Sequence, residues 1–229
     1  MSATKVGADV LQRARVLLRS PRGANTRVIL GSSSKIRRKL MDELCEEVGE
    51  NLLRYDVLTA DIDEKAIRRK DPSELVTVLA KAKAEAIKKK MDELLQEPGQ
   101  EGEALLITCD QVVVHEGRIL EKPETAEEAR EFIAGYARNP CSTVGAVAVT
   151  DLGTGRVELE VDEAHIHFTP IPADTVDALV EEGEVFWCAG GLMVEHEMVQ
   201  PHVTKIEGTM DGVMGLPKAR VLGLLSKFY

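Results

Sequence analysis

The chain has 229 residues, 44% of them hydrophobic and 30% charged, a balance that is typical of a globular domain and too apolar for disorder. Its 39 acidic and 29 basic residues give a net charge of −10, which argues against nucleic acid or an anionic membrane as a partner. No apolar run approaches the roughly 20 residues that span a bilayer. The 4 cysteines include no C-x-x-C pair, so we expect a cytoplasmic protein without disulfides or a zinc site.

Residues 1–26 are predicted to form an N-terminal extension, followed by a single domain over residues 27–229. The extension is basic, with Asp9 as its one acid against the cations Lys5, Arg13, Arg15, Arg19 and Arg22. Two interpretations stay open. We favour an N-terminal helix or arm of a cytosolic protein, and the composition also weakly resembles an organelle presequence.

The next feature is a strand, a Gly/Ser loop and a helix over residues 28–48. Four cations, Lys35, Arg37, Arg38 and Lys39, fall in the first turns of the predicted helix. A helix N-terminus carries about half a positive charge, so each cation there is unfavourable by about 0.3–1 kcal/mol. An anion such as phosphate, bound by free backbone N–H groups, would resolve this conflict. A solvated basic face behind a Ser34 N-cap explains the pattern equally well from composition alone.

Arg37 is predicted to lie on the inner side of this helix. Met41, Leu44 and Val48 follow it at i+4, i+7 and i+11, which is the spacing of one helical face. We therefore expect the Arg37 side chain to point toward the interior rather than into solvent.

A long helix is predicted to begin at Asp71-Pro72-Ser73-Glu74, a sequence with an N-cap, a proline at N1 and a capping-box glutamate, and to end before Pro98-Gly99. Its apolar stripe is expected to contain Leu75, Val78, Leu79, Ala82, Ala86, Ile87, Met91 and Leu94. Lys83 borders this stripe, so it either finds a partner there or extends along the edge of the core to solvent.

An acid interrupts the most apolar strand of the sequence. The predicted strand over residues 104–109 ends on Asp110-Gln111, and Val112-Val113-Val114 resumes at once. A charge inside an apolar strand is costly unless it is paired or binds a metal, so Asp110 is a better functional candidate than the acids on helix surfaces.

The remainder alternates between helix and strand signals. We expect a helix from Thr125 to Tyr136, paired strands over 143–150 and 157–168, and helices near 172–182 and 216–228. Strands that alternate with helices in this way predict a mixed α/β fold.

Several short motifs in this order resemble the Maf (septum-formation inhibitor) family. They are Gly31-Ser32-Ser33-Ser34 with Arg37-Arg38, residues 60–64, Leu79-Ala80 with Lys83-Ala84, residues 109–113, Glu121-Lys122-Pro123, Ala189-Gly190-Gly191, and residues 213–217. The resemblance implies an α/β fold with two lobes, a mixed sheet and a cleft between the lobes, as in inosine triphosphatases. It also implies a nucleoside triphosphate pyrophosphatase that uses a divalent cation, and a homodimer.

The resemblance maps the family's reactive residues onto Arg37, Glu64, Lys83, Asp110 and Lys122. The residue chemistry agrees with these roles: Ser32, Ser34 and Arg37 can hold phosphate, while Lys83 and Lys122 neutralise charge at the reacting group. Glu64, together with Asp110, is expected to bind Mg²⁺ or Mn²⁺, and Asp110 to orient or deprotonate the attacking water. Without the resemblance, residues 61–64 would be an acidic turn before a basic run.

Three positions bear on the base that is recognised: Gln111, Glu195 and Ile36. Gln and Glu at the first two resemble the branch that acts on 7-methyl-GTP, more than the branch that acts on dTTP and UTP. A carboxylate can accept hydrogen bonds from the N1–H and N2–H₂ edge of guanine. Ile36 replaces the Trp that this branch often carries. For Trp187, the only tryptophan, we expect a partly buried packing role rather than stacking on the base.

Other classes of function are also considered. A regulator of cell division that binds a triphosphate without hydrolysing it is the main alternative, although binding alone would not require Asp110 inside a strand. A kinase is disfavoured because the chain lacks the G-x-x-x-x-G-K-[ST] sequence.

Overall fold

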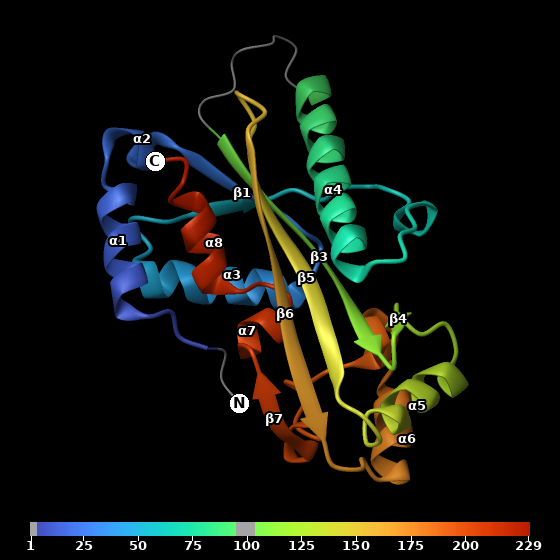
Figure 1. Ribbon diagram of the computed structural model, residues 1–229. Helices are drawn as coiled ribbons and strands as arrows, with labels where there is room; N and C mark the ends of the chain where they lie inside the picture. Colours follow the sequence, from blue (N-terminus) through green and yellow to red (C-terminus); the bar gives the residue numbers. More distant parts are fainter. Residues whose placement is uncertain (1–3, 95–103) are drawn as a thin grey trace.

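We analysed a computed structural model, which describes residues 4–94 and 104–229. The fold is built on one 7-stranded mixed sheet in the order β2-β1-β3-β5-β6-β7, with β4 paired to β3 outside this path (Figure 1). β1 is parallel to both β2 and β3, and the other pairs are antiparallel. The strands are β1 (Arg27–Gly31), β2 (Tyr55–Val57), β3 (Ala104–His115), β4 (Arg118–Leu120), β5 (Cys141–Asp151), β6 (Val157–Phe168) and β7 (Val203–Glu207).

Helices cover the sheet on both faces and at one end. The α-helices are α1 (Ala8–Leu18), α2 (Pro21–Asn25), α3 (Lys35–Val48), α4 (Pro72–Leu94), α5 (Ala126–Gly135), α6 (Ala173–Glu182), α7 (Met210–Val213) and α8 (Lys218–Leu225). Short 3₁₀ helices are η1 (Glu64–Ala66), η2 (Glu184–Trp187), η3 (Ala189–Gly191) and η4 (Gln200–His202). In the part of the chain that the structure describes, no helix is both long and apolar enough to cross a membrane.

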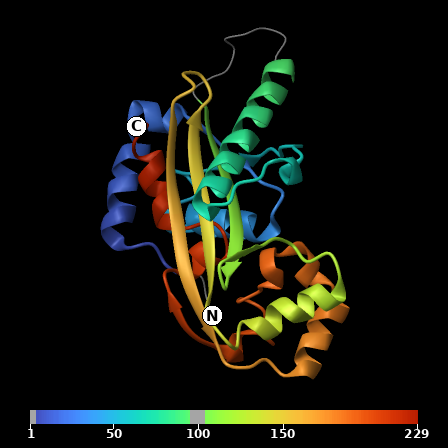
Figure 2. The same ribbon diagram turned by 45° about the vertical axis from the view of Figure 1, so that its right-hand side comes forward.

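The long strands β3, β5 and β6 run through two lobes (Figures 1 and 2). In the upper lobe, α1, α3 and α8 pack on one sheet face, around Leu30, Ile107 and Val149, and α4 packs on the other, around Ile29 and Leu106. In the lower lobe, α5 and α6 bury a separate core around Ile133, Leu179 and Ile166. The mixed α/β architecture with two lobes is therefore confirmed.

The edge of β3 that pairs with β1 and β4 has an unpaired stretch between these two strands, which we call the gap in the sheet. β1 pairs with β3 as far as Gly31 opposite Thr108, and β4 begins to pair with β3 only at Val113 opposite Leu120. On that side, none of the strands in the described ranges pairs with the intervening residues 109–112. Backbone groups of β3 in this stretch are therefore left for side chains to bond, as the Cys109 carbonyl does with Arg37.

The predicted end of the strand at Asp110 is wrong. The strand does not end at Asp110 but continues through it, because Asp110 pairs with Ala146 in the ladder to β5. The elements predicted after β3 are confirmed: the long antiparallel pair is β5 and β6, and the helices expected near 125–136, 172–182 and 216–228 are α5, α6 and α8.

α4 begins as predicted, since the Asp71 carboxylate accepts from the backbone N–H of Glu74 at 2.7 Å. Its expected end before Pro98-Gly99 lies outside the described residues. The buried face is turned slightly from the predicted stripe: Val76, Ala80 and Ala84 are buried, whereas the predicted Val78, Ala82 and Ala86 are only partly buried.

The N-terminal segment packs onto the upper lobe. Val6, Ala14 and Leu18 belong to the same core cluster as α3 and α8. Arg15 donates to the carbonyls of Glu47 at 2.7 Å and Val48 at 2.9 Å, and thereby caps the C-terminal end of α3. The division of the chain at residue 27 stays a prediction.

Candidate active site

The Gly/Ser loop that follows β1 has the geometry of an anion site. Ser34 is the N-cap of α3 and accepts from the backbone N–H of Arg37 at 3.3 Å. The buried hydroxyl of Ser32 accepts from the backbone N–H of Ser34 at 3.2 Å. The loop therefore ends β1 and starts α3 beside the gap in the sheet, with the positive end of the helix dipole at that position.

Arg37 points inward, as the helical spacing predicts. Its Nε donates to the Gly215 carbonyl at 2.9 Å, and its Nη1 donates to the Cys109 carbonyl, on the open edge of β3, at 3.0 Å. Two of the five donors of the guanidinium are thus held by backbone, and within the described ranges no hydrogen bond occupies the other three, which suit an anionic ligand.

Gly215 permits this contact. Its φ is +92°, and a Cβ atom there would lie 3.1 Å from Arg37 Nε and 3.2 Å from Gln111 Oε1. Both the left-handed backbone and the close approach therefore require glycine. Arg37 and Gln111 are fixed by the same turn, because Gln111 Nε2 donates to the Gly212 carbonyl at 2.9 Å.

Asp110 is paired through α4. Lys83 Nζ lies 2.5 Å from Asp110 Oδ1 and 2.9 Å from Glu64 Oε1. The side chains of Lys83 and Asp110 are 12% and 8% exposed, whereas that of Glu64 is 50% exposed. Burial raises the pKa of Asp110 above its ordinary value, and the charges of Lys83 and Arg37 offset part of this rise.

Lys122 lies in the other lobe, in the loop after β4. It is exposed, and among the described residues no hydrogen bond or ion pair holds its ammonium group. Burial raises the pKa of Cys188 to about 11, and the charge of Lys122 offsets a small part of this rise. The Glu121 carbonyl accepts from the backbone N–H of Gly190 at 2.8 Å, which joins the Lys122 loop to η3.

The residues expected to recognise the base are divided between the lobes. Glu195 is partly buried; burial raises the pKa of its carboxyl, Glu184 raises it further, and Lys39 on α3 lowers it. Lys39 of the upper lobe therefore lies near enough to act on the charge of Glu195. Ile36 packs against the core cluster of the upper lobe.

The expectation for Trp187 is wrong. Its side chain is 77% exposed, because the short helix η2 turns Val185 into the core and leaves Trp187 outside. The local sequence, in which Trp187 precedes Cys188-Ala189-Gly190, does not indicate whether the tryptophan is buried or exposed.

The two acids could share a divalent cation. Oxygens of Glu64 and Asp110 both lie within hydrogen-bonding distance of Lys83 Nζ, so the carboxylates converge on one small region. Mg²⁺ is commonly bound by one or two carboxylates with waters and phosphate oxygens. No group of three or more His, Cys, Asp or Glu side chains suited to a metal occurs in the described ranges, so further ligands would come from substrate and water.

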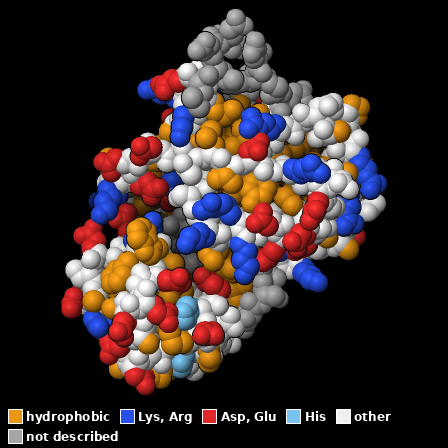
Figure 3. Space-filling model, turned by 180° about the vertical axis from the view of Figure 1, so that it is seen from behind, with side chains coloured by type: hydrophobic (Ala, Val, Ile, Leu, Met, Phe, Trp, Pro, Cys, Tyr) orange, Lys and Arg blue, Asp and Glu red, His pale blue; other side chains and the backbone are white. Residues whose placement is uncertain are grey.

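The surface is hollowed between the two lobes, and basic and acidic side chains gather around the hollow (Figure 3). A small pocket is lined by Asp110 and Gln111 of β3 and by Gly212, Gly215 and Pro217 of the turn that holds Arg37. Acceptors supplied by backbone carbonyls, at Cys109, Gly212 and Gly215, were not predicted, because carbonyl groups leave no signature in side-chain sequence.

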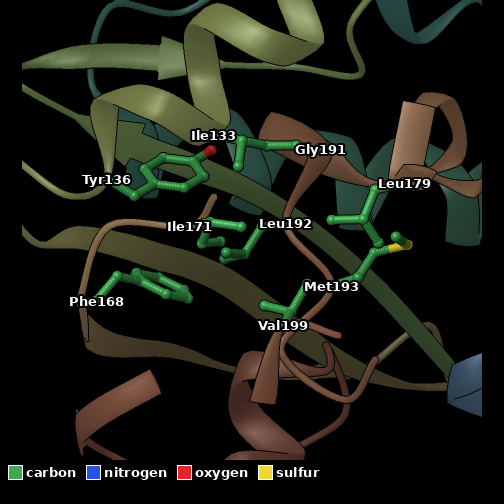
Figure 4. Close-up of a pocket in the computed structure, with 9 residues that line it drawn as sticks. All are labelled: Ile133, Tyr136, Phe168, Ile171, Leu179, Gly191, Leu192, Met193 and Val199. Atoms are coloured by element: carbon green, nitrogen blue, oxygen red, sulfur yellow. The ribbon is translucent and has the colours of Figure 1, made fainter. Parts of the chain in front are cut away.

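A second pocket has a different character. It is lined by apolar residues of the lower lobe, among them Tyr136, Phe168 and Met193, and contains none of the predicted site residues (Figure 4). The Tyr136 hydroxyl donates to the Gly190 carbonyl at 2.6 Å, so this region supports the loop that precedes Glu195.

The fold and the site define a mixed α/β protein with a site for a polyanion between two lobes. The chain belongs to the family described as Maf-like protein, whose model matches residues 27–228, and the resemblance inferred from sequence is confirmed.

Three relatives show the range of named activities in this family. The chain is 36% identical to the "7-methyl-GTP pyrophosphatase" of Dictyostelium discoideum over 200 residues, 87% of this chain and 96% of the relative. It is 31% identical to the "7-methyl-GTP pyrophosphatase" of Idiomarina loihiensis, over 86% of this chain and 92% of the relative. The "dTTP/UTP pyrophosphatase" of Pelotomaculum thermopropionicum is 30% identical, over 88% of this chain and 96% of the relative.

Proposed function

We propose that the chain is a nucleoside triphosphate pyrophosphatase that releases a nucleoside monophosphate and pyrophosphate, with 7-methyl-GTP as its preferred substrate. The family and the named activities of the relatives support the reaction class. The observation that carries the proposal is Asp110, mid-strand and buried, paired with Lys83 beside the gap where Arg37 is held.

The polyphosphate would lie against the Gly/Ser loop and the first turn of α3. Ser32, Ser34, backbone N–H groups and the other three donors of Arg37 provide hydrogen bonds to its oxygens. Lys122, exposed in the loop after β4 and without a protein partner among the described residues, balances charge on the leaving phosphates.

Asp110 is the base in this proposal. Hydrolysis adds the oxygen of water to one phosphorus and breaks its bond to the bridging oxygen, so a proton of the water must be removed. The raised pKa of Asp110 makes its carboxylate a better proton acceptor than an exposed aspartate, and Lys83 orients it.

Glu64 and Asp110 would hold the divalent cation, Mg²⁺ or Mn²⁺. When bound, the cation neutralises phosphate charge. Glu64 is half-exposed and so is reached from solvent, whereas Asp110 is buried.

Base recognition is assigned to Gln111 and Glu195. The Glu195 carboxylate can accept from the N1–H and N2–H₂ groups of guanine, and a uracil or thymine edge offers only one donor. Ile36, partly buried against the core of the upper lobe, stays a candidate for apolar contact with the base. The printed names of two relatives support the same nucleotide.

We also propose a homodimer in a reducing, cytoplasmic compartment. The dimer follows from the family resemblance, and its test is the mass of the purified chain in solution. The compartment is supported by four free cysteines, three of them buried.

The test is product analysis of the purified chain with Mg²⁺ or Mn²⁺ and a panel of 7-methyl-GTP, GTP, dTTP, UTP, CTP and inosine triphosphate. We expect pyrophosphate rather than orthophosphate, released fastest from 7-methyl-GTP. A preference for dTTP or UTP would contradict the assignment of Gln111 and Glu195 while leaving the reaction class intact. Nucleotide binding without any product would instead identify a nucleotide-binding regulator.

A further inference from the structure

Two ion pairs bridge the lobes beside the proposed site. Lys65 in η1 pairs with Glu124, and Arg68 pairs with Glu121 at 3.2 Å. The first residue of each pair belongs to the segment between β2 and α4, and the second to the loop after β4. Both segments lie on the same side of the molecule, one above the other (Figures 1 and 2).

These pairs lie next to Glu64 and Lys122, which have roles in the proposed reaction. Lys65 is adjacent to Glu64, and Lys122 lies between Glu121 and Glu124 in the sequence. Arg68 makes the link direct: its Nη1 donates to the Glu64 carbonyl at 3.4 Å, to the Ile67 carbonyl at 3.1 Å and to Glu121 Oε1 at 3.2 Å. One guanidinium therefore ties the backbone of Glu64 to the neighbour of Lys122.

Neither Glu64 nor Lys122 is positioned by core packing. Glu64 is half-exposed in a short 3₁₀ turn, and Lys122 is exposed. Asp110 and Lys83, by contrast, belong to β3 and α4, which pack against each other through a buried cluster. Glu64 is tied to the rigid pair through its 2.9 Å contact with Lys83, and the Lys122 loop is tied to Gly190, but neither of these contacts joins the Glu64 segment to the Lys122 segment.

We propose that the Lys65–Glu124 and Arg68–Glu121 pairs form a latch that holds Glu64 and Lys122 against the same substrate. Lys65, Arg68, Glu121 and Glu124 are positioning residues, since they act through Glu64 and Lys122. This inference rests on the proposed function. Lys65 and Glu124 are each 70% exposed, so the latch is weak, of the kind that opens to admit a ligand and closes around it.

The latch makes a prediction that a simple charge effect does not. If only the local field mattered, Lys65→Glu would weaken triphosphate binding, Glu124→Lys would strengthen it, and the double variant would show the sum of the two effects. If the pair is a latch, each single reversal breaks it and lowers kcat/KM, and the double reversal restores it.

The experiment uses the full chain with 7-methyl-GTP, and it measures pyrophosphate release for K65E, E124K and K65E/E124K. An exposed ion pair is weak, but reversal of one partner replaces its attraction with repulsion, so each single variant should lose about five- to tenfold in kcat/KM. The double variant should recover to within about twofold of wild type. The matched control is K89E, which reverses an exposed lysine paired with Glu93 on α4 and should leave kcat/KM unchanged.

Hydrogen exchange in residues 62–70 gives a readout that does not need turnover. Exchange there should be faster in both single variants than in wild type and slow again in the double variant. Additive effects, or an E124K variant that is more active than wild type, would overturn the latch while the proposed function stands. A wild-type chain that releases no pyrophosphate overturns the proposed function, and with it this inference.

Discussion

The ammonium of Lys83, on α4, lies 2.5 Å from Oδ1 of Asp110, on β3. Both side chains are largely buried, so removing the two charges from water has a large free-energy cost. The strong attraction between the charges offsets this cost. Burial remains the larger influence on Asp110, because the pKa of its carboxyl is raised in spite of the adjacent lysine. The Asp110 carboxylate is therefore a stronger base than that of an ordinary aspartate.

Replacing Asp110 with Asn should separate activity from stability. We expect kcat to fall by about 10² to 10⁴, the usual range for loss of a general base. Since a raised pKa means that the fold disfavours the ionised form, the neutral amide should leave the melting temperature at pH 7 no lower than in wild type. Steady-state kinetics and thermal unfolding test this, with D92N, an exposed acid of α4, as the matched control. A folded D110N enzyme with near-normal kcat would reject the role of Asp110.

Arg37→Lys should weaken substrate binding more than it slows turnover. A lysine retains the charge but cannot donate simultaneously to the Gly215 and Cys109 carbonyls and to phosphate, because it lacks the planar fork. We expect KM for the triphosphate to rise about tenfold or more, with a smaller change in kcat. R54K, at an exposed arginine that donates to the Glu50 carbonyl, should behave as wild type. An unchanged KM in R37K would mean that the guanidinium only supports the turn at Gly215.

The pH dependence of guanine recognition follows from Glu195. The folded-state pKa of this carboxyl is raised above 4.5, mainly by burial, so the carboxylate is lost as pH falls through that raised value. We expect the inhibition constant of 7-methyl-GMP to rise as the pH is lowered from 7 toward that raised pKa, while that of UMP stays nearly constant because its base does not require this acceptor. E195Q should remove the difference. A parallel rise for both nucleotides would show that the titrating group contacts the phosphate instead.

Local sequence signals predicted the frame of the site better than its details. The Ser34 cap, the inward face of Arg37 and the long pair β5–β6 follow from spacing and capping alone. The strands β2 and β7 were missed: β2 has only three residues, too few for a period to be recognised, and β7 is a short, mostly exposed strand beside β6. Asp110 looked like a strand end because polar residues usually mark one. The ladder to β5 carries the strand through it.

The partners of the site residues depend on contacts far apart in the sequence. Arg37 is held by Gly215, 178 residues away, and Gln111 by Gly212, 101 residues away. Lys83 reaches Asp110 because α4 buries Val76, Ala80 and Ala84 beside part of the predicted stripe, a slight rotation that brings Lys83 toward β3. The positions of these backbone acceptors and the orientation of α4 about its axis are determined by tertiary packing. No local sequence pattern therefore predicts them.

Removal of divalent metal should abolish turnover without unfolding the chain. We expect EDTA to stop pyrophosphate release and Mg²⁺ or Mn²⁺ to restore it, because phosphate charge must be neutralised in the cleft. Glu64→Gln should raise the Mg²⁺ concentration needed for half-maximal rate by about tenfold or more, since one hard oxygen ligand becomes a weaker one. E74Q, at an exposed glutamate paired with Arg69, is the control. Full activity in EDTA would exclude the assignment of Glu64 and Asp110 as metal ligands.

The buried ammonium of Lys218 gives the sharpest prediction on stability. Lys218 is 1% exposed, and its Nζ lies 2.5 Å from Glu47 Oε1 and 3.2 Å from Glu43 Oε2. Glu47→Ala would leave this cation with one partner and also remove the acceptor of the Val6 backbone N–H, bonded at 2.9 Å.

We expect E47A to lower the free energy of unfolding by about 2–4 kcal/mol, because an incompletely paired buried charge is costly. Urea unfolding of E47A and wild type measures this difference. The control is E46A, at the exposed glutamate one position earlier, which should change stability by less than about 0.5 kcal/mol. Equal stability of E47A and wild type would show that Glu43 and water suffice for Lys218, and that the N-terminal segment contributes little through Val6.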